Sequence, residues 1–261
     1  MVKGLDLFRE RFRGFESAYT LIGGAACDEW FSSQGLRFRA TRDLDIVLII
    51  EDFDPAFGRV LRNFIRAGEY EIRQRTEESP ILYRFAKPKN VSFPFMLELF
   101  SRKPDGVELE DGQEIVVIPS GTDQHSLSAL LLDENYYQLI RTHKEIRDGL
   151  PFANATALIP LKAHAWLNLV QRRKAGAEVD SQNISKHRND VFRLAATLPG
   201  EAGPEVPNPI KGDLVSFLEA FPENNEAWPS ILASLKETFG GGTRPATLRS
   251  AIRNFFGLPV E

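Results

Sequence analysis

The chain has 261 residues and a net charge of −4, with 43% apolar and 26% charged residues. These values are typical of a globular protein, exclude a disordered or fibrous chain, and leave room for one large domain or two small ones. One cysteine cannot form an internal disulfide, and one cysteine with four histidines does not favour a structural zinc site. No apolar run reaches the ~20 residues that span a bilayer, and the first residues lack the apolar stretch of a signal peptide. We therefore expect a cytoplasmic protein that does not contact membranes.

The first half of the sequence alternates between strand and helix patterns. A strand is predicted at 17–22, followed by two glycines and a helix at 25–33. Five consecutive aliphatic residues within 42–51 are typical of a strand buried on both faces. Asp54 and Pro55 supply an N-cap and a first-turn proline for a helix that runs to about residue 67. Further strands are predicted at 70–75, 81–85, 93–101 and 114–118.

Helix patterns dominate after about residue 125. The predicted helices are 134–147, 159–174, 184–198, 213–221, 227–239 and 246–256. A stretch rich in proline and glycine, 198–212, forms a linker or an ordered loop. We therefore expect an α+β protein, in which a small mixed β-sheet domain (1–150) precedes a helical C-terminal domain (151–261).

Two acids stand at the start of the most apolar strand. Asp43 and Asp45 are separated by one residue, so both side chains point to the same face of the strand, about 7 Å apart. Neighbouring carboxylates repel each other, and a hard cation such as Mg²⁺ removes that repulsion. The alternative is that both acids end a solvent-exposed strand, with Arg39 or Arg42 neutralising one of them.

A third acid lies in a later strand, FPFMLELFS (93–101). Glu98 has apolar neighbours on both sides, and a buried carboxylate requires a cationic partner. If Glu98 joins Asp43 and Asp45, the three carboxylates form a site suited to two metal ions. The alternative is an ion pair between Glu98 and an arginine inside the fold.

Gly23 and Gly24 separate the first strand from the helix that follows it. Glycine allows a left-handed backbone and a close approach of a phosphate group to the positive N-terminus of a helix. A plain turn is the alternative. The sequence is not a P-loop, because no Gly-Lys-Ser/Thr follows, and it lacks the Gly-x-Gly-x-x-Gly of dinucleotide-binding folds.

The order strand, Gly-Gly, helix, Asp-x-Asp strand and later acid resembles the DNA polymerase β-like nucleotidyltransferase superfamily. The segments IGGAA, RATRDLDIVL, IPLKAHAWL and KHRNDVFRL are similar to AbiEii/MenT-type bacterial nucleotidyltransferases, over roughly residues 18–198. That family is best known for toxins of toxin–antitoxin and phage-defence systems. The resemblance implies an enzyme that uses Mg²⁺, with two ions, to transfer an NMP from an NTP to an acceptor hydroxyl.

The resemblance also assigns expected roles to individual residues. The positions that match the catalytic, metal-binding acids are Asp43, Asp45 and Glu98. The positions that match nucleotide-binding residues are Gly23, Gly24, Thr41, Lys162 and Asp190. Asn189 is an alternative for the last of these, and a lysine stem that reaches the solvent is the alternative for Lys162. An ion pair within its own helix, with Lys186 or His187, is the alternative for Asp190.

Two features depart from the family pattern. The residue after the glycine pair is usually Ser or Thr, and here it is Ala25; the 18 residues between Gly24 and Asp43 also exceed the usual spacing. Both departures favour an alternative function, an inactive module that binds a nucleotide or a partner protein on the same fold.

The acceptor of the expected reaction is not specified by the sequence. Residues 160–194 contain 7 Lys/Arg and 3 Asp/Glu, whereas residues 1–154 contain 20 and 25. The basic segment suits tRNA or another RNA as acceptor, and the acidic remainder suits a protein or a small molecule. By resemblance, a cognate antitoxin is a further expected partner.

Overall fold

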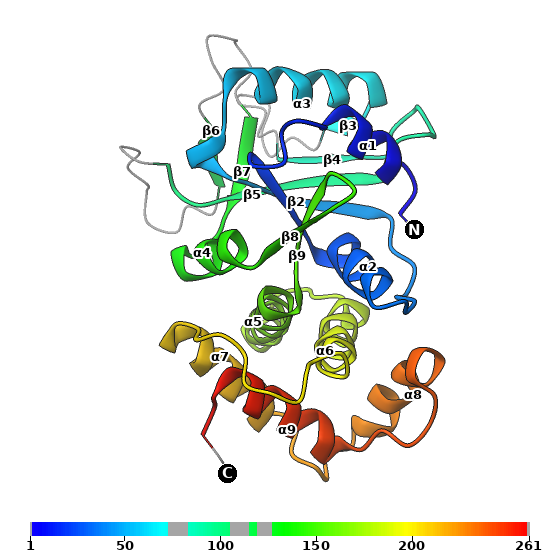
Figure 1. Cartoon of the computed structure of the whole chain (residues 1–261), viewed down its shortest axis with the longest axis vertical. Helices are drawn as coiled ribbons and strands as arrows, with labels where there is room; N and C mark the ends of the chain where they lie inside the picture. The colour runs from blue at the N-terminus through cyan, green and yellow to red at the C-terminus, as the bar shows by residue number, and fades with distance from the viewer. Residues whose placement is uncertain (1, 73–82, 105–114, 119–126, 260–261) are drawn as a thin grey trace. The chain divides into compact units, whose positions relative to one another are not determined.

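The computed structural model describes residues 2–72, 83–104, 115–118 and 127–259 (Figure 1). The chain divides into two units, Met1–Ala153 (unit 1) and Asn154–Glu261 (unit 2). The domain boundary expected from the sequence lies between residues 150 and 151. Strands and helices share the described part of unit 1, whereas the regular elements described in unit 2 are all helices. The mixed α+β fold class is thus confirmed.

Unit 1 is built on one mixed sheet, whose described strands follow the order β3-β4-β5-β2-β1-β9-β8 (Figure 1). The strand β7 adds to β5, and β6 pairs with β7. The pairs β2–β5, β1–β9 and β5–β7 are parallel, and the others are antiparallel. The strands are β1 (Tyr19–Ile22), β2 (Asp43–Leu48), β3 (Glu71–Ile72), β4 (Arg84–Ala86), β5 (Met96–Ser101), β6 (Ile115–Ile118), β7 (Leu127–Leu131), β8 (Lys144–Arg147) and β9 (Leu150–Ala153).

Helices accompany this sheet. The helices described in unit 1 are α1 (Leu5–Arg11), α2 (Gly23–Ser33), α3 (Pro55–Gly68) and α4 (Glu134–Thr142), with a 3₁₀ turn at Ile50–Asp52. The predicted start of α3 is confirmed, because the carboxylate of Asp54 accepts a hydrogen bond from the backbone N–H of Phe57 at 2.6 Å.

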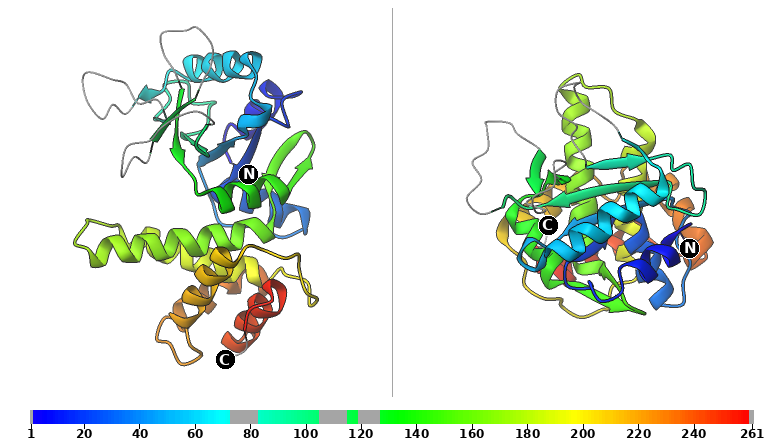
Figure 2. Two further views of the ribbon diagram at one scale, coloured as in Figure 1. Left: turned by 90° about the vertical axis from the view of Figure 1, so that its left-hand side faces the viewer. Right: turned by 90° about the horizontal axis from the view of Figure 1, so that it is seen from above.

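The helices α1 and α3 lie over one face of the sheet (Figures 1 and 2). Aromatic side chains fill the space between them. The ring of Tyr19 in β1 lies 5.4 Å from Phe8 of α1, 5.8 Å from Phe12, the residue that follows α1, and 6.0 Å from Phe57 of α3, between ring centroids. Side chains alternate along a strand, so Leu44 and Ile46 of β2 face this core and the residues between them face the opposite side. That opposite side is called the polar face below.

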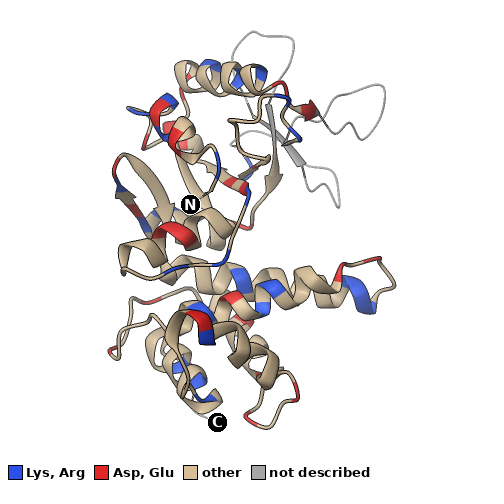
Figure 3. Cartoon of the chain, turned by 90° about the vertical axis from the view of Figure 1, so that its right-hand side faces the viewer, with Lys and Arg blue, Asp and Glu red and all other residues tan. Residues whose placement is uncertain are grey.

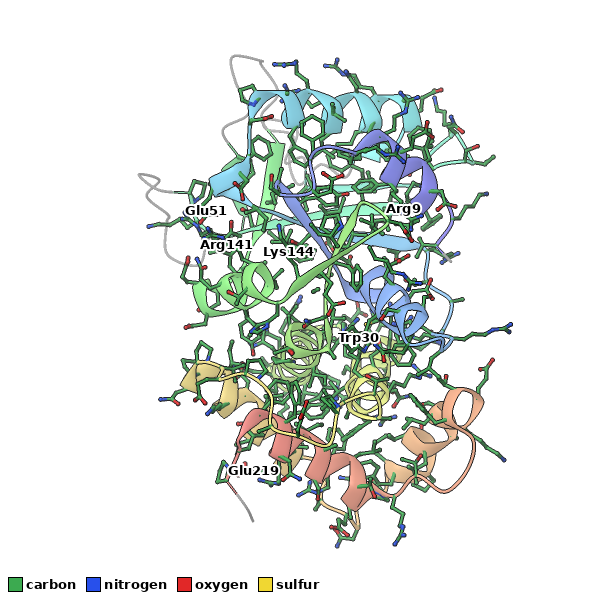
Figure 4. All side chains as sticks on the ribbon, viewed as in Figure 1. Arg9, Trp30, Glu51, Arg141, Lys144 and Glu219 are labelled. Carbon is green, nitrogen blue, oxygen red and sulfur yellow. The ribbon has the colours of Figure 1, made fainter. Side chains whose placement is uncertain are left out.

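A cluster of charges ties α4 to the end of β2. Glu51 accepts hydrogen bonds from the Tyr137 hydroxyl at 2.5 Å and from Arg102 Nε at 3.0 Å, and Arg141 lies 3.6 Å away. Figure 4 shows Glu51 and Arg141 next to each other. Burial would raise the pKa of Glu51, but these hydrogen bonds and the charge of Arg102 favour the carboxylate and hold the pKa below its ordinary value.

In the helical unit 2, α5 (Ala155–Lys174) packs on both α6 (Ser181–Ala195) and α7 (Asn208–Glu219). The unit also contains α8 (Trp228–Phe239) and α9 (Pro245–Phe256). Its core is aromatic as well, with Phe192 and Phe217 in contact at 5.4 Å between ring centroids. The buried residues of α5 end at Ala163, and Arg172, Arg173 and Lys174 are exposed at its C-terminal end (Figure 3).

The prediction of one helix over 134–147 is wrong beyond Thr142. The chain turns back there and forms the hairpin β8–β9 instead. Asp148 and Gly149 have φ angles of 51° and 77°, the left-handed pair that a tight two-residue hairpin turn requires. The Asp-Gly dipeptide is a local hairpin signal that outweighs the helical pattern before it.

Some predicted elements differ in extent. The sequence analysis did not predict α1 or β7, and α2 begins at Gly23 instead of after the glycine pair. Parts of the predicted strands 70–75, 81–85 and 114–118 lie outside the described residues. Among the helices that the structure describes, none combines the length and the apolar character needed to cross a membrane.

Candidate active site

Asp43 and Asp45 lie on the polar face of unit 1, at the start of β2. Both are half-buried, whereas the intervening Leu44 and the following Ile46 are fully buried in the aromatic-covered core. The alternation places the two carboxylates on one side of the strand, as the sequence predicted. Asp45 is the cross-strand neighbour of Ile22, the last residue of β1, and this register places the Asp-x-Asp pair beside the turn into α2.

Glu98 is the register partner of Asp45 in the parallel pair β2–β5. The strands that carry Asp45 and Glu98 are therefore direct neighbours in the sheet. The Glu98 side chain, however, pairs with Arg84 of β4, whose Nε donates to Glu98 Oε1 at 2.7 Å and whose Nη2 donates to the same oxygen. The arginine ion pair that the sequence left as an alternative is thus present, and within the described residues no group of three acids, histidines or cysteines is placed to hold a metal ion.

Gly23 is required where the chain passes the Asp45 carboxylate. Its φ is +66°, a left-handed conformation that side chains rarely adopt, and a Cβ built on it would lie 1.7 Å from Asp45 Oδ2. The space made by the missing side chain is therefore filled by the carboxylate itself. Because Gly23 is also the first residue of α2, the negative charge lies at the helix end where the macrodipole favours it.

Gly24 makes room for a hydroxyl group in the same way. A Cβ on Gly24 would lie 2.4 Å from Thr41 Oγ1. Thr41, on the segment that leads into β2, therefore brings a hydroxyl to the first turn of α2, whose third residue is the buried Ala25.

The donor set on the polar face fits a hard divalent cation in part. Carboxylates and hydroxyls are oxygen ligands, and Mg²⁺ is usually held by one or two carboxylates together with substrate phosphates. Asp43 and Asp45 meet that requirement. Glu98 belongs to the same face, but its charge is already balanced by Arg84.

Lys162 and Asp190 meet each other in unit 2. Lys162 of α5 is only 4% exposed and Asp190 of α6 is fully buried, and Lys162 Nζ lies 3.4 Å from Asp190 Oδ2. Arg193 Nη1 donates to the other oxygen of Asp190 at 3.1 Å. The alternative in which the Lys162 stem reaches the solvent does not hold, because the ammonium group is paired inside the helical unit.

Sequence reasoning did not single out Arg84 or Arg193, although both bind predicted site residues. Arg193 follows Asp190 by one helical turn, so the i,i+3 spacing was a usable signal. Arg84 had no such signal, because it reaches Glu98 only through the antiparallel register of β4 and β5. Asn189, the alternative to Asp190, accepts a hydrogen bond from Arg188.

Unit 2 also contains a cavity of about 550 Å³ between the end of α6 and the start of α9. None of the predicted site residues lines it.

No family model matches the chain, and no curated protein sequence matches it either. The function is therefore inferred from the sequence and from the geometry of the polar face.

Proposed function

We propose that the protein is a Mg²⁺-dependent nucleotidyltransferase of the AbiEii/MenT type, which transfers an NMP from an NTP to an acceptor hydroxyl. The observation that carries the proposal is the contact of the Asp45 carboxylate with Gly23 at the first turn of α2, with Asp43 on the same face of β2. It joins the two parts of the sequence resemblance, the glycine pair and the Asp-x-Asp strand, in one place.

Each residue of this group has a chemical role in the proposed reaction. Asp43 and Asp45 hold the divalent cation, which neutralises the triphosphate charge when it is bound. The first turn of α2 and the Thr41 hydroxyl offer hydrogen-bond donors to phosphate oxygens. The acceptor hydroxyl attacks the α-phosphorus in line, its proton passes to a base such as Glu98, and pyrophosphate leaves.

A second candidate is an inactive module that binds a nucleotide or a partner protein. The ion pair of Glu98 with Arg84 favours it, because this carboxylate already has a cationic partner and does not join Asp43 and Asp45. Ala25, in place of the usual hydroxyl residue, favours it as well. The two candidates differ in whether pyrophosphate is released.

Thermal unfolding with each NTP, with and without Mg²⁺, tests the proposal. A ligand at 100 times its Kd stabilises the folded state by about 2.7 kcal/mol, which corresponds to roughly 5–10 °C for a chain of this size. We expect a Mg²⁺-dependent shift with at least one NTP in the wild type and its loss in Asp45→Asn. Asp6→Asn, which changes an exposed acid of the same unit, should keep the shift. No shift with any NTP would reject the nucleotidyltransferase and also an inactive module that binds a nucleotide.

The acceptor is tested with an NTP labelled at the α-phosphate. Label that enters RNA and is removed by ribonuclease identifies an RNA acceptor, including tRNA, whereas label that enters protein identifies a side-chain hydroxyl. RNA binding should also weaken steeply as salt increases. Stable binding of the labelled NTP without transfer and without pyrophosphate release would favour the inactive module. In the proposed toxin role, co-expression with a cognate antitoxin should suppress the activity.

A further inference from the structure

Arg84 and Glu98 are direct neighbours on two antiparallel strands of the polar face. Their Cα atoms are register partners in the β4–β5 pair, and two guanidinium nitrogens donate to the same carboxylate oxygen. The Glu98 side chain is 11% exposed and that of Arg84 is 32% exposed. The carboxylate is thus almost enclosed and needs a cationic partner, whereas the guanidinium reaches the surface and stays solvated when it leaves the pair.

On its other side, Glu98 has Asp45 as register partner across β2–β5. Cross-strand partners point to the same face, so Arg84, Glu98 and Asp45 form a row over three adjacent strands. Glu98 therefore lies between a cationic and an anionic neighbour. Attraction to Arg84 and repulsion from Asp45 both favour the Glu98 rotamer toward Arg84. A divalent ion at Asp43 and Asp45 removes the repulsion and offers Glu98 a second cation to bind.

We propose that Arg84 is a positioning residue that holds Glu98 away from Asp45 until a divalent cation is bound. The inference rests on the proposed function, because it assigns the control of the third carboxylate in that site. Arg84 and the cation compete for the same carboxylate. This competition explains why the acids share one face without forming a three-carboxylate group in the described structure.

A purely structural role for Arg84 predicts a different result. If Arg84 only neutralises a buried acid, its removal destabilises unit 1 and does not strengthen metal binding through Glu98. If Arg84 competes with the cation, its removal frees Glu98 and binding becomes tighter. Loss of a nearby positive charge also strengthens cation binding without any role for Glu98, so the experiment has to separate that effect.

The test measures the affinity of the full chain for Mn²⁺ without nucleotide, by paramagnetic resonance of the free ion. We expect Arg84→Gln to bind Mn²⁺ about tenfold tighter than the wild type, a change of about 1.4 kcal/mol. In the Glu98→Gln background, Arg84→Gln should tighten binding much less, because only the loss of a nearby positive charge remains. Arg84→Lys, which keeps the charge but loses the two-nitrogen contact, should fall in between and replaces Arg84→Gln if that variant does not fold.

Three results would overturn the proposal. They are an unchanged or weaker Mn²⁺ affinity in Arg84→Gln, no Mn²⁺ binding in either protein, and an equal tightening in the Glu98→Gln background. Arg42→Gln, which removes an exposed charge next to Asp43, measures the field effect alone. A failure of this proposal is distinguishable from a failure of the proposed function. The latter is tested separately, by the nucleotide-dependent shift in unfolding temperature and its loss in Asp45→Asn.

Discussion

At the scale of single residues, the candidate site depends on two glycines whose missing side chains make room for oxygen atoms of other segments. A Cβ atom on Gly23 would overlap Asp45 Oδ2, and a Cβ atom on Gly24 would clash with Thr41 Oγ1. The sequence predicted the glycines as a cradle for phosphate. The structure adds that they allow the acid and the hydroxyl to reach the first turn of α2.

Gly23→Ala should therefore cost more than its backbone conformation alone. A left-handed alanine costs about 1 kcal/mol, and at Gly23 the added methyl group also has to displace Asp45. Gly35 is the matched control, because its φ is +70° and nothing lies within 4 Å of its would-be Cβ. We expect Gly35→Ala to show only the conformational cost in thermal unfolding, and Gly23→Ala to unfold at lower temperature and lose the nucleotide-dependent shift. Equal behaviour of the two variants would contradict the steric argument.

At the scale of elements, α5 and α6 are joined by buried charges. Asp190 is completely buried and has a cation on each carboxylate oxygen, Lys162 from the neighbouring helix and Arg193 from its own. Buried ion pairs contribute little net stability compared with apolar packing, but the loss of one partner leaves an uncompensated charge. Lys162 and Asp190 thus have a structural task in unit 2 besides the nucleotide-binding role that the resemblance implies.

Removal of the shared acid should be the most damaging change in this group. Asp190→Ala takes the carboxylate away from the nearly buried Lys162 and from Arg193, and we expect a loss of about 3–5 kcal/mol in the free energy of unfolding. Lys162→Met should cost less, because Asp190 keeps Arg193. Asp213→Ala, which removes the partly exposed partner of His164, is the control and should cost about 1 kcal/mol or less. Urea unfolding measures all three, and a cost for Asp190→Ala no larger than the control would refute the argument.

At the scale of the whole molecule, two acids of unit 1 change its stability with pH in opposite directions. In unit 1, the pKa of Glu51 lies below its ordinary value of 4.5, so its stabilising effect is complete above that value and is lost as the pH falls through the folded-state pKa. Glu29 acts in the opposite direction. Burial raises its pKa despite the nearby charge of Arg9, so the stability it contributes is complete below pH 4.5 and is lost as the pH rises through the raised pKa.

Hydrogen exchange followed peptide by peptide from pH 3 to 6 tests these signs. We expect Glu51→Gln to reduce the acid-induced loss of protection in β2 and α4, by on the order of 1 kcal/mol. Glu29→Gln should increase that loss. Peptides of unit 2 should respond as in the wild type in both variants, because Glu51 and Glu29 belong to unit 1. The same acid response in all three proteins would show that other groups dominate.

Local patterns in the sequence were enough to predict several elements and the acids of the polar face. The Asp54-Pro55 start of α3 depends on a contact within one helical turn, and the alternation in β2 depends on the geometry of one strand. The hairpin β8–β9 was missed although Asp148-Gly149 signals it, because the helical pattern before it was extended too far.

Only the tertiary structure decided which charged side chains form ion pairs with each other. Glu98 pairs with Arg84 because of the β4–β5 register, and Lys162 meets Asp190 because α5 packs on α6. Neither contact follows from a periodicity along the chain, since each joins two elements whose relative placement depends on the packing of an entire unit. The sequence by itself therefore determined several elements, among them β2 and α3, and the acids of the candidate site. The packing of each unit decided which partner each charge has.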